Sequence, residues 1–238
     1  MITIYHPEIP IAERLIFALD VADVEQARAW IARLGDAVTH YKIGLELLSG
    51  GAYFELLGEL KDAGKRVFAD LKFHDIPATV AAAVAGLASH QPDLLTVHAY
   101  PAAIRAAVPR AGTSKLLAVT VLTSISADEL RASGVASAMD ETVLARARDA
   151  ILAGAAGLVC SGLEAKHLRA ELGAAPLIVC PGIRAADSGD DQQRTVNVAT
   201  AFANGADYIV VGRPIRLAHD PRAAALAIQQ SIAKLFES

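Results

Sequence analysis

Short runs of apolar, often β-branched residues recur along the whole chain, separated by longer alanine-rich segments. The runs occupy residues 15–20, 37–44, 66–72, 94–99, 116–122, 157–162, 176–182 and 208–214. In the segments between them, apolar residues recur three or four positions apart, which is the spacing of an amphipathic helix. Strands that are apolar on both faces and alternate with helices are typical of a parallel sheet with helices on both sides.

Eight strand and helix units in 238 residues predict a (β/α)8 barrel, a fold whose usual length is about 250 residues. An open, doubly wound sheet is the alternative. It is disfavoured because the segment after the first strand reads LDVADVEQA and lacks the phosphate-binding turn G-x-G-x-x-G. The unit between the fifth and sixth strands is longer than the others, but no linker rich in proline, glycine or serine follows it. We therefore expect residues 1–238 to form a single barrel domain.

The composition favours a compact globular protein that binds a small molecule. Hydrophobic residues make up 53% of the chain, charged residues make up 20%, and the formal net charge is -4. Nucleic acids and acidic membranes usually recruit clustered lysine and arginine, so we expect neither as a partner. The N-terminal stretch lacks the pattern of a signal peptide, and no segment has the roughly 18 consecutive apolar residues of a membrane span. We expect a cytoplasmic protein.

The cysteines and histidines indicate no metal site. Cys160 and Cys180 are the only cysteines, and their spacing matches neither a redox pair nor a zinc site, so we expect two buried, reduced thiols. A disulfide between them is the alternative. His74 and His98 lie near predicted strand ends, but no histidine has a partner at metal-ligand spacing. We therefore predict neither a metal nor a cofactor.

Polar residues gather at the predicted C-terminal ends of the strands, where (β/α)8 barrels carry their catalytic groups. We expect the strand starts to carry no comparable set. The polar strand-end residues are Asp20, Lys42, Asp70, Lys72, His98, Thr120, Thr123 and Ser161.

The stretch FADLKFHDIPATV places three charges where a buried strand turns into an alanine-rich helix. Alternation puts Phe68, Asp70 and Lys72 on one strand face, directed into the barrel mouth. Asp75 is expected in the first turn of the next helix, where the dipole favours a carboxylate. Lys42 of the neighbouring strand extends this row, in which opposite charges keep the ammonium groups protonated. A solvated salt bridge or a buried structural ion pair is the alternative.

A phosphate site is predicted after the seventh and eighth strands. In many barrels the loops at these positions bind phosphate through backbone N–H groups and a short helix. The PGIR segment supplies Arg184 at the first position, and Gly212 followed by Arg213 stands at the second. Glycine admits close approach of a phosphate oxygen, and arginine binds two oxygens at once. An ordinary turn glycine and a surface arginine are the alternative.

A lysine held between carboxylates next to a phosphate site suits a reaction in which a carbanion forms and is protonated. No cofactor motif is present to accept the electrons, so the protein itself must stabilise the charge. Decarboxylation is one such reaction. A Schiff-base aldolase also uses a lysine, but it generally needs a depressed lysine pKa, which flanking carboxylates oppose.

Seven segments of the chain occur in the order of a known family. They read ALD, YKIG, DLKFHDIP, VTVLTS, PGIR, DQ and VVGRP, and the matching stretch of the chain runs from about Leu15 to Pro221. Together they resemble the bacterial type of orotidine 5'-phosphate decarboxylase. The resemblance implies conversion of orotidine 5'-monophosphate to UMP and CO2 in de novo pyrimidine synthesis, without metal or organic cofactor, by a homodimeric barrel.

The resemblance also implies a role for each matching residue. Lys72 would protonate C6 of the pyrimidine as CO2 leaves, and Asp70 would repel the departing carboxylate. Lys42 and Asp75 would complete the charged row, with Asp75 and Thr79 reaching into the site of the other subunit. The remaining contacts would be Asp20 and Lys42 at the ribose, Thr123 at the pyrimidine, and Arg184, Gln192, Gly212 and Arg213 at the phosphate.

One departure and two rival functions accompany the resemblance. Ala78 stands where the family often has asparagine, a change that leaves the charged residues intact. Related Mg²⁺-dependent sugar-phosphate decarboxylases and synthases share the D-x-K-x-x-D pattern but end strand two with an acid, where this chain has Lys42. A non-catalytic phosphosugar-binding barrel is the other rival, and it would gain nothing from desolvating a row of charges.

Overall fold

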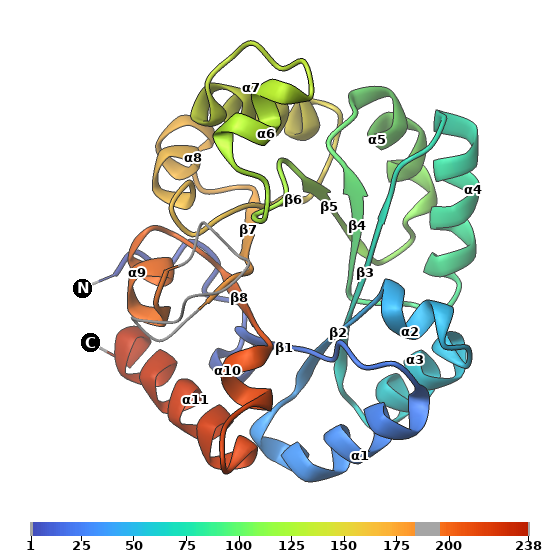
Figure 1. Cartoon of the computed structure of the whole chain (residues 1–238), viewed down its shortest axis with the longest axis vertical. Coiled ribbons are helices and arrows are strands. Elements are labelled where there is room, and N and C mark those ends of the chain that lie inside the picture. Colours follow the sequence, from blue (N-terminus) through green and yellow to red (C-terminus); the bar gives the residue numbers. More distant parts are fainter. Residues whose placement is uncertain (1, 184–195, 238) are drawn as a thin grey trace.

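The computed structural model of the chain describes residues 2–183 and 196–237. Its parallel strands close into a barrel in chain order, with β1 paired to both β2 and β8. Seen down the barrel, the strands form the centre of the molecule (Figure 1). The predicted (β/α)8 fold is confirmed. The strands are β1 (Leu15–Ala18), β2 (His40–Gly44), β3 (Arg66–Phe73), β4 (Leu94–His98), β5 (Lys115–Val119), β6 (Gly157–Val159), β7 (Leu177–Cys180) and β8 (Tyr208–Val211).

Helices surround the strands (Figure 1). The longer unit expected between β5 and β6 holds both α6 and α7. The α-helices are α1 (Val24–Leu34), α2 (Leu45–Ser49), α3 (Tyr53–Asp62), α4 (Pro77–Ala88), α5 (Pro101–Ala107), α6 (Ala127–Ala132), α7 (Met139–Leu152), α8 (Ala165–Leu172), α9 (Val198–Ala203), α10 (Arg213–Arg216) and α11 (Pro221–Glu237). Short 3-10 helices are η1 (Ile11–Glu13), η2 (Gly35–Ala37) and η3 (Val108–Arg110).

Local sequence explains where several helices begin. The Asp23 side chain accepts the N–H of Gln26 at the start of α1. At the start of α6, Ser126 and Glu129 cap each other's backbone N–H groups in a capping box. α4 begins with Pro77, whose fixed φ and missing N–H suit the first helical position. Such caps satisfy donors that the helix itself leaves unpaired.

Alternation along the strands divides the core into two layers. Ile16 and Phe68 point into the barrel, together with other side chains of the interior cluster. Leu15, Phe17 and Val67 point outward into the larger cluster between strands and helices. All five are almost fully buried, so both faces of the sheet are apolar, as expected of a helix-covered parallel sheet. The alternation predicted for the third strand is therefore confirmed at Phe68.

Charged residues also gather at the starts of the strands, contrary to expectation. Arg66 at the start of β3 contacts Glu13 at 3.1 Å and Asp93 at 2.7 Å, measured between nitrogen and oxygen. Lys61 Nζ lies 2.8 Å from the other Asp93 oxygen. We call Glu13, Lys61, Arg66 and Asp93 the base network. No local sequence pattern marks it, because its members come from separate elements of the chain.

The two cysteines lie inside the fold, as expected. Cys160 and Cys180 are both buried and free. A hydrogen bond with Cys180, together with burial, raises the pKa of the Cys160 thiol. Within residues 2–183 and 196–237, no helix has the length and apolar character needed to cross a membrane.

Candidate active site

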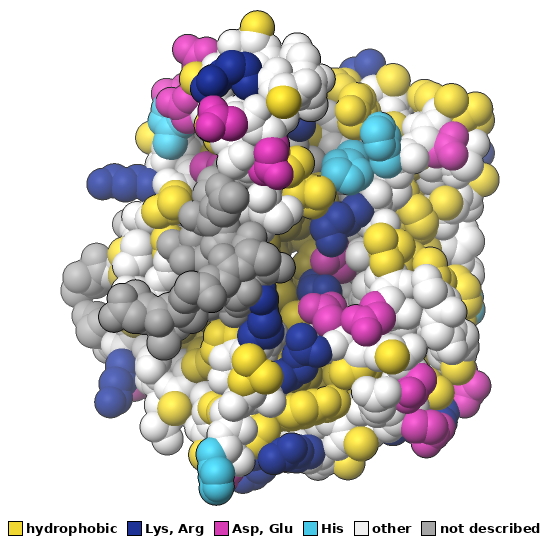
Figure 2. Space-filling model, in the orientation of Figure 1, with side chains coloured by type: hydrophobic (Ala, Val, Ile, Leu, Met, Phe, Trp, Pro, Cys, Tyr) yellow, Lys and Arg dark blue, Asp and Glu magenta, His cyan; other side chains and the backbone are white. Residues whose placement is uncertain are grey.

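A cavity of about 360 Å³ opens at the C-terminal ends of the strands, where catalytic groups were expected. Figure 2 shows acidic and basic side chains meeting in the hollow at the centre of this face. The predicted residues that line the cavity are Asp20, Lys42, Asp70, Lys72, Thr123, Gly212 and Arg213.

Four charged side chains from three neighbouring strand ends form an alternating row. Lys42 Nζ lies 2.8 Å from Asp20 Oδ1 and 3.4 Å from Asp70 Oδ2. Lys72 Nζ lies 2.8 Å from the same Asp70 oxygen. We call Asp20, Lys42, Asp70 and Lys72 the mouth network. Its centre is the Asp70 carboxylate, one oxygen of which faces two ammonium groups.

Burial and charge oppose each other within the mouth network. Burial acts to raise the pKa of Asp70, which is 7% exposed, but the charges of Lys42 and Lys72 outweigh it and lower that pKa below its ordinary value. Burial likewise acts to lower the pKa of Lys42, but Asp70 and Asp20 raise it above its ordinary value. Both groups are therefore charged at neutral pH although they are largely removed from water.

Strand β3 is irregular where it carries the two central charges. Ala69 pairs with Leu95 and Phe73 pairs with Val97, so β3 takes four steps where β4 takes two. Within this irregularity Lys72 has a φ of 49°. That left-handed conformation costs a residue other than glycine about 1–2 kcal/mol. Backbone strain of this kind recurs at functional sites, where the surrounding structure maintains it.

Two residues of the site escape prediction from the sequence. Thr96 on β4 is fully buried and donates its hydroxyl to Asp70 Oδ1 at 3.0 Å. Its only signal in the sequence is a polar atom inside the apolar run LLTVH. Arg216, at the end of α10, lines the cavity and donates to the backbone carbonyl of Asp20. It stands in a short helical turn, where a surface arginine is the ordinary interpretation.

Asp75 and Thr79 are exposed and lie outside the cavity lining. The Asp75 carboxylate accepts the N–H of Ile76 at 2.6 Å. It makes no ion pair with any described residue of its own chain, so the acid, base, acid row of Asp70, Lys72 and Asp75 is not closed within one chain. The expectation that Asp75 lies in the first turn of α4 is wrong, because Pro77 takes the first helical position and Ile76 precedes it.

The predicted phosphate end combines a close backbone approach with two arginines. Gly212 precedes α10, and a Cβ atom built there would lie 3.2 Å from the Cβ of Ala18 on β1. Any side chain at this position would crowd the neighbouring strand end. Arg213 and Arg216 both line the cavity. Arg184 and Gln192, the other predicted phosphate contacts, lie outside the described residues.

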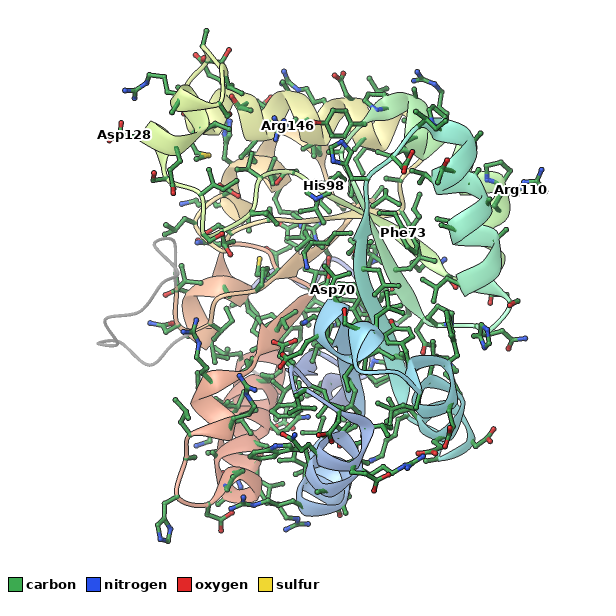
Figure 3. All side chains as sticks on the ribbon, turned by 45° about the vertical axis from the view of Figure 1, so that its right-hand side comes forward. Asp70, Phe73, His98, Arg110, Asp128 and Arg146 are labelled. Atoms are coloured by element: carbon green, nitrogen blue, oxygen red, sulfur yellow. The ribbon has the colours of Figure 1, made fainter. Side chains whose placement is uncertain are left out.

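The other polar strand-end residues lie beside the active-site cavity or bond to local backbone. Thr120 donates its hydroxyl to the carbonyl of Val159, and Ser161 Oγ accepts the N–H of Leu163. His98 lines a separate, smaller pocket with Arg146, and Figure 3 shows it between Asp70 and that arginine. Burial, followed by neighbouring positive charges, lowers the pKa of His98. Among the described residues, no three acidic, histidine or cysteine side chains are grouped to hold a metal ion.

Comparison with known proteins identifies the family. A sequence model described as "Orotidine 5'-phosphate decarboxylase / HUMPS family" matches residues 13–228. The chain belongs to this family. It is 54% identical over 224 residues to orotidine 5'-phosphate decarboxylase of Stenotrophomonas maltophilia (strain K279a), a match that covers 93% of each protein. It is 51% identical over 225 residues to that of Xylella fastidiosa (strain M12), covering 93% of this chain and 92% of the relative.

Solved structures of the orotidine 5'-phosphate decarboxylase family have the same architecture. The crystal structure of orotidine 5'-phosphate decarboxylase from Lactobacillus acidophilus matches with a TM-score of 0.81 and 37% sequence identity. The match covers 95% of this chain and 100% of that one. The resemblance noted in the sequence is thus confirmed, and so is the enzyme class that it implied.

Proposed function

We propose that the cavity converts orotidine 5'-monophosphate to UMP and CO2, the last step of de novo pyrimidine synthesis, without a metal or organic cofactor. The observation that carries the proposal is the buried Asp70 carboxylate, held charged between two ammonium groups at the cavity. In a reaction without a cofactor, a site that stabilises an anion on the substrate needs fixed positive charge from the protein itself. Membership of the family supports the same reaction.

Lys72 is the proton donor in this proposal. The bond between C6 and the carboxylate carbon breaks, its electron pair stays on C6, and CO2 leaves. The Lys72 ammonium then gives a proton to C6 and is recharged from solvent. Lys72 suits this role because its Nζ lines the cavity and pairs with one carboxylate, Asp70, among the described residues. A positioned proton donor contributes roughly 10²–10⁴-fold to a rate.

Asp70 and Lys42 set the electrostatics around the reacting carbon. Asp70 faces the substrate carboxylate and disfavours its charge in the ground state, a repulsion relieved when CO2 leaves. Lys42 holds Asp70 ionised from the other side, at 3.4 Å. In the same proposal Asp20 and Lys42 bind the ribose, and Thr123 lies beside the pyrimidine ring.

The phosphate end supplies binding energy away from the reacting carbon. Gly212 and Arg213 bind the phosphate, together with Arg184 and Gln192, which lie outside the described residues. Two lining arginines, Arg213 and Arg216, support this assignment, because the charges of the mouth network are paired with one another. Contacts to a remote phosphate lower the barrier when they position the ring for the reaction.

We also propose that the barrel acts as a cytoplasmic homodimer of single-domain chains, with Asp75 and Thr79 reaching the site of the other subunit. Their exposure supports this arrangement, as does the exposure of the neighbouring apolar residues Ile76 and Tyr100, which are 66% and 50% exposed. A carboxylate from a second chain would complete the row beyond Lys72. Exposed apolar side chains at such a place are typical of an interface.

Lys42 disfavours the Mg²⁺-dependent rival. That mechanism calls for an acid at the end of β2, but the residue there is a charged ammonium, 2.8 Å from Asp20. An ammonium group in this position repels a divalent cation and occupies carboxylate oxygens that the metal would need.

An ultraviolet assay of orotidine monophosphate loss in the presence of EDTA tests the proposed function. We expect full activity of the unmodified protein after chelation and no detectable activity of Lys72→Ala. Lys61→Ala removes a lysine of similar exposure from the base network and should leave the rate unchanged. A requirement for added Mg²⁺ would overturn the proposal in favour of the sugar-phosphate chemistry, and activity in Lys72→Ala would remove the proposed proton donor.

A further inference from the structure

Thr96 connects the two central residues of the mouth network from behind the cavity wall. It lies in the middle of β4 with no exposed surface, and it does not line the cavity. Its Oγ1 lies 3.0 Å from Asp70 Oδ1 and 2.9 Å from the backbone nitrogen of Lys72. No other described side chain is bonded to both of these residues.

The direction of both hydrogen bonds follows from the chemistry of the groups. A backbone N–H only donates, so the Thr96 oxygen accepts from Lys72. An ionised carboxylate only accepts, so the single hydroxyl proton points at Asp70. The single donor of the Thr96 hydroxyl is therefore committed to Asp70, and its orientation is fixed as long as Asp70 is charged. The lowered pKa of Asp70 is consistent with this bond, which is one of its causes.

The two bonds act on different degrees of freedom. The bond to Asp70 Oδ1 fixes the rotation of the carboxylate, so that Oδ2 is the oxygen presented to Lys42 and Lys72. The bond from the Lys72 N–H replaces a regular ladder bond where β3 shifts its register against β4. It therefore helps to maintain the left-handed backbone that aims the Lys72 side chain.

We propose that Thr96 is a positioning residue for the decarboxylation, holding the Asp70 carboxylate and the Lys72 backbone in their reactive arrangement through one hydroxyl group. The proposal rests on the proposed function and deepens it. Thr96 touches neither the cavity nor a substrate within it, so it acts through its two partners. A displacement of about 1 Å at a reacting group can cost roughly 10²-fold in rate.

Two pairs of variants isolate the hydroxyl. Thr96→Val keeps the shape of the side chain and removes only the hydroxyl. Thr96→Ser and Thr96→Ala both lack the methyl group and differ only in the hydroxyl. We expect kcat to fall about 10- to 100-fold in Thr96→Val and Thr96→Ala, with a smaller change in KM, because the remote phosphate contacts are intact. Thr96→Ser should retain most of the wild-type kcat.

Thr142→Val is the control for loss of a buried hydroxyl. Thr142 on α7 is 7% exposed, and its hydroxyl makes no hydrogen bond to any described residue. This variant should match the wild-type kcat. Thermal unfolding of every variant accompanies the kinetics. If Thr96→Val does not fold, the comparison of Thr96→Ser with Thr96→Ala still decides the question.

Three results would overturn the proposal for Thr96. They are wild-type kcat in Thr96→Val, equal kcat in the serine and alanine variants, and a loss confined to KM. Each would assign Thr96 a packing role. Failure of the proposed function gives a different result, because the wild-type protein would then not decarboxylate orotidine monophosphate at all.

Discussion

Strand β3 carries a charged network at each end, and the two networks differ in how their central carboxylates are paired. In the base network, both oxygens of the Asp93 carboxylate accept hydrogen bonds. One of its oxygens accepts from Arg66, and the other accepts from Lys61 and from the N–H of Val67. These contacts outweigh burial and lower the pKa of Asp93. Such a network holds strand ends together, although its members also line a cavity of about 400 Å³ at the base of the barrel.

In the mouth network, Asp70 is crowded by positive charge instead of being evenly paired. Two ammonium groups share one oxygen, and Lys72 sits on a strained backbone at the edge of a cavity. The pKa of Asp70 is lowered, as is that of Asp93. The direction of a pKa shift therefore does not separate a structural network from a catalytic one. The strained backbone of Lys72 and the position at the C-terminal ends of the strands distinguish the mouth network.

Replacing the central acid of each network gives the largest expected contrast. Asp70→Asn should lower kcat by roughly 10²–10³-fold, the cost of removing one key electrostatic group from an active site. Asp93→Asn should leave kcat unchanged and reduce the free energy of unfolding by about 2 kcal/mol, because it weakens charged hydrogen bonds. Steady-state kinetics and urea unfolding at pH 7 measure the two effects. An Asp93→Asn enzyme that is stable but slow would show that the base network takes part in the reaction.

His40 and Lys42 extend the comparison to a single strand, because both stand on β2, His40 fully buried and Lys42 largely so. Burial lowers the pKa of His40 to about 4 and outweighs its bond to the Glu13 carbonyl, which acts to raise that pKa. Two carboxylates instead keep Lys42 charged. Because the unfolded chain binds a proton at His40 near pH 6.5 and the folded chain does not, stability should fall as the pH drops from 6.5 to 4. The loss is about 3 kcal/mol.

His40→Asn should flatten this pH dependence, measured as the free energy of unfolding in urea at pH 7 and at pH 4. Asparagine retains a donor for the Glu13 carbonyl but does not titrate. His98→Asn is the matched variant at the other end of the barrel. This variant should keep most of the dependence of the unfolding free energy on pH, because His98 is only partly buried. An unchanged slope in His40→Asn would mean that this histidine is protonated within the fold.

The barrel and most of the mouth network were predictable from two features of the sequence. These are the spacing of apolar residues and the position of charged residues at the ends of the apolar runs. Apolar runs alternating with helical spacing specify the strands, and alternation then places Asp70 and Lys72 on one face. Parallel strands bring their ends to one rim, which accounts for Asp20 and Lys42. Neither step requires knowing which residues from distant segments are in contact.

The parts that escaped prediction depend on contacts between distant segments. The base network joins Glu13 to Arg66 and Asp93, and no local pattern marks these three as partners. Thr96 reads as an ordinary β-branched strand residue, and its importance follows only from the shifted register of β3 against β4. Local chemistry also misled at Asp75, where the proline that starts α4 leaves the acid outside the helix.

Arginines offer the mildest test of the same contrast. Arg213 lines the active-site cavity, whereas Arg66 forms ion pairs with Glu13 and Asp93 at the base of the barrel. Arg213→Ala should raise KM for orotidine monophosphate about tenfold and change kcat less, because a charged hydrogen bond to phosphate is worth about 1.5 kcal/mol or more. Arg66→Ala should leave KM as it is and cost only stability. An unchanged KM in Arg213→Ala would place the phosphate elsewhere, and a raised KM in Arg66→Ala would mean that the two ends of the barrel are coupled.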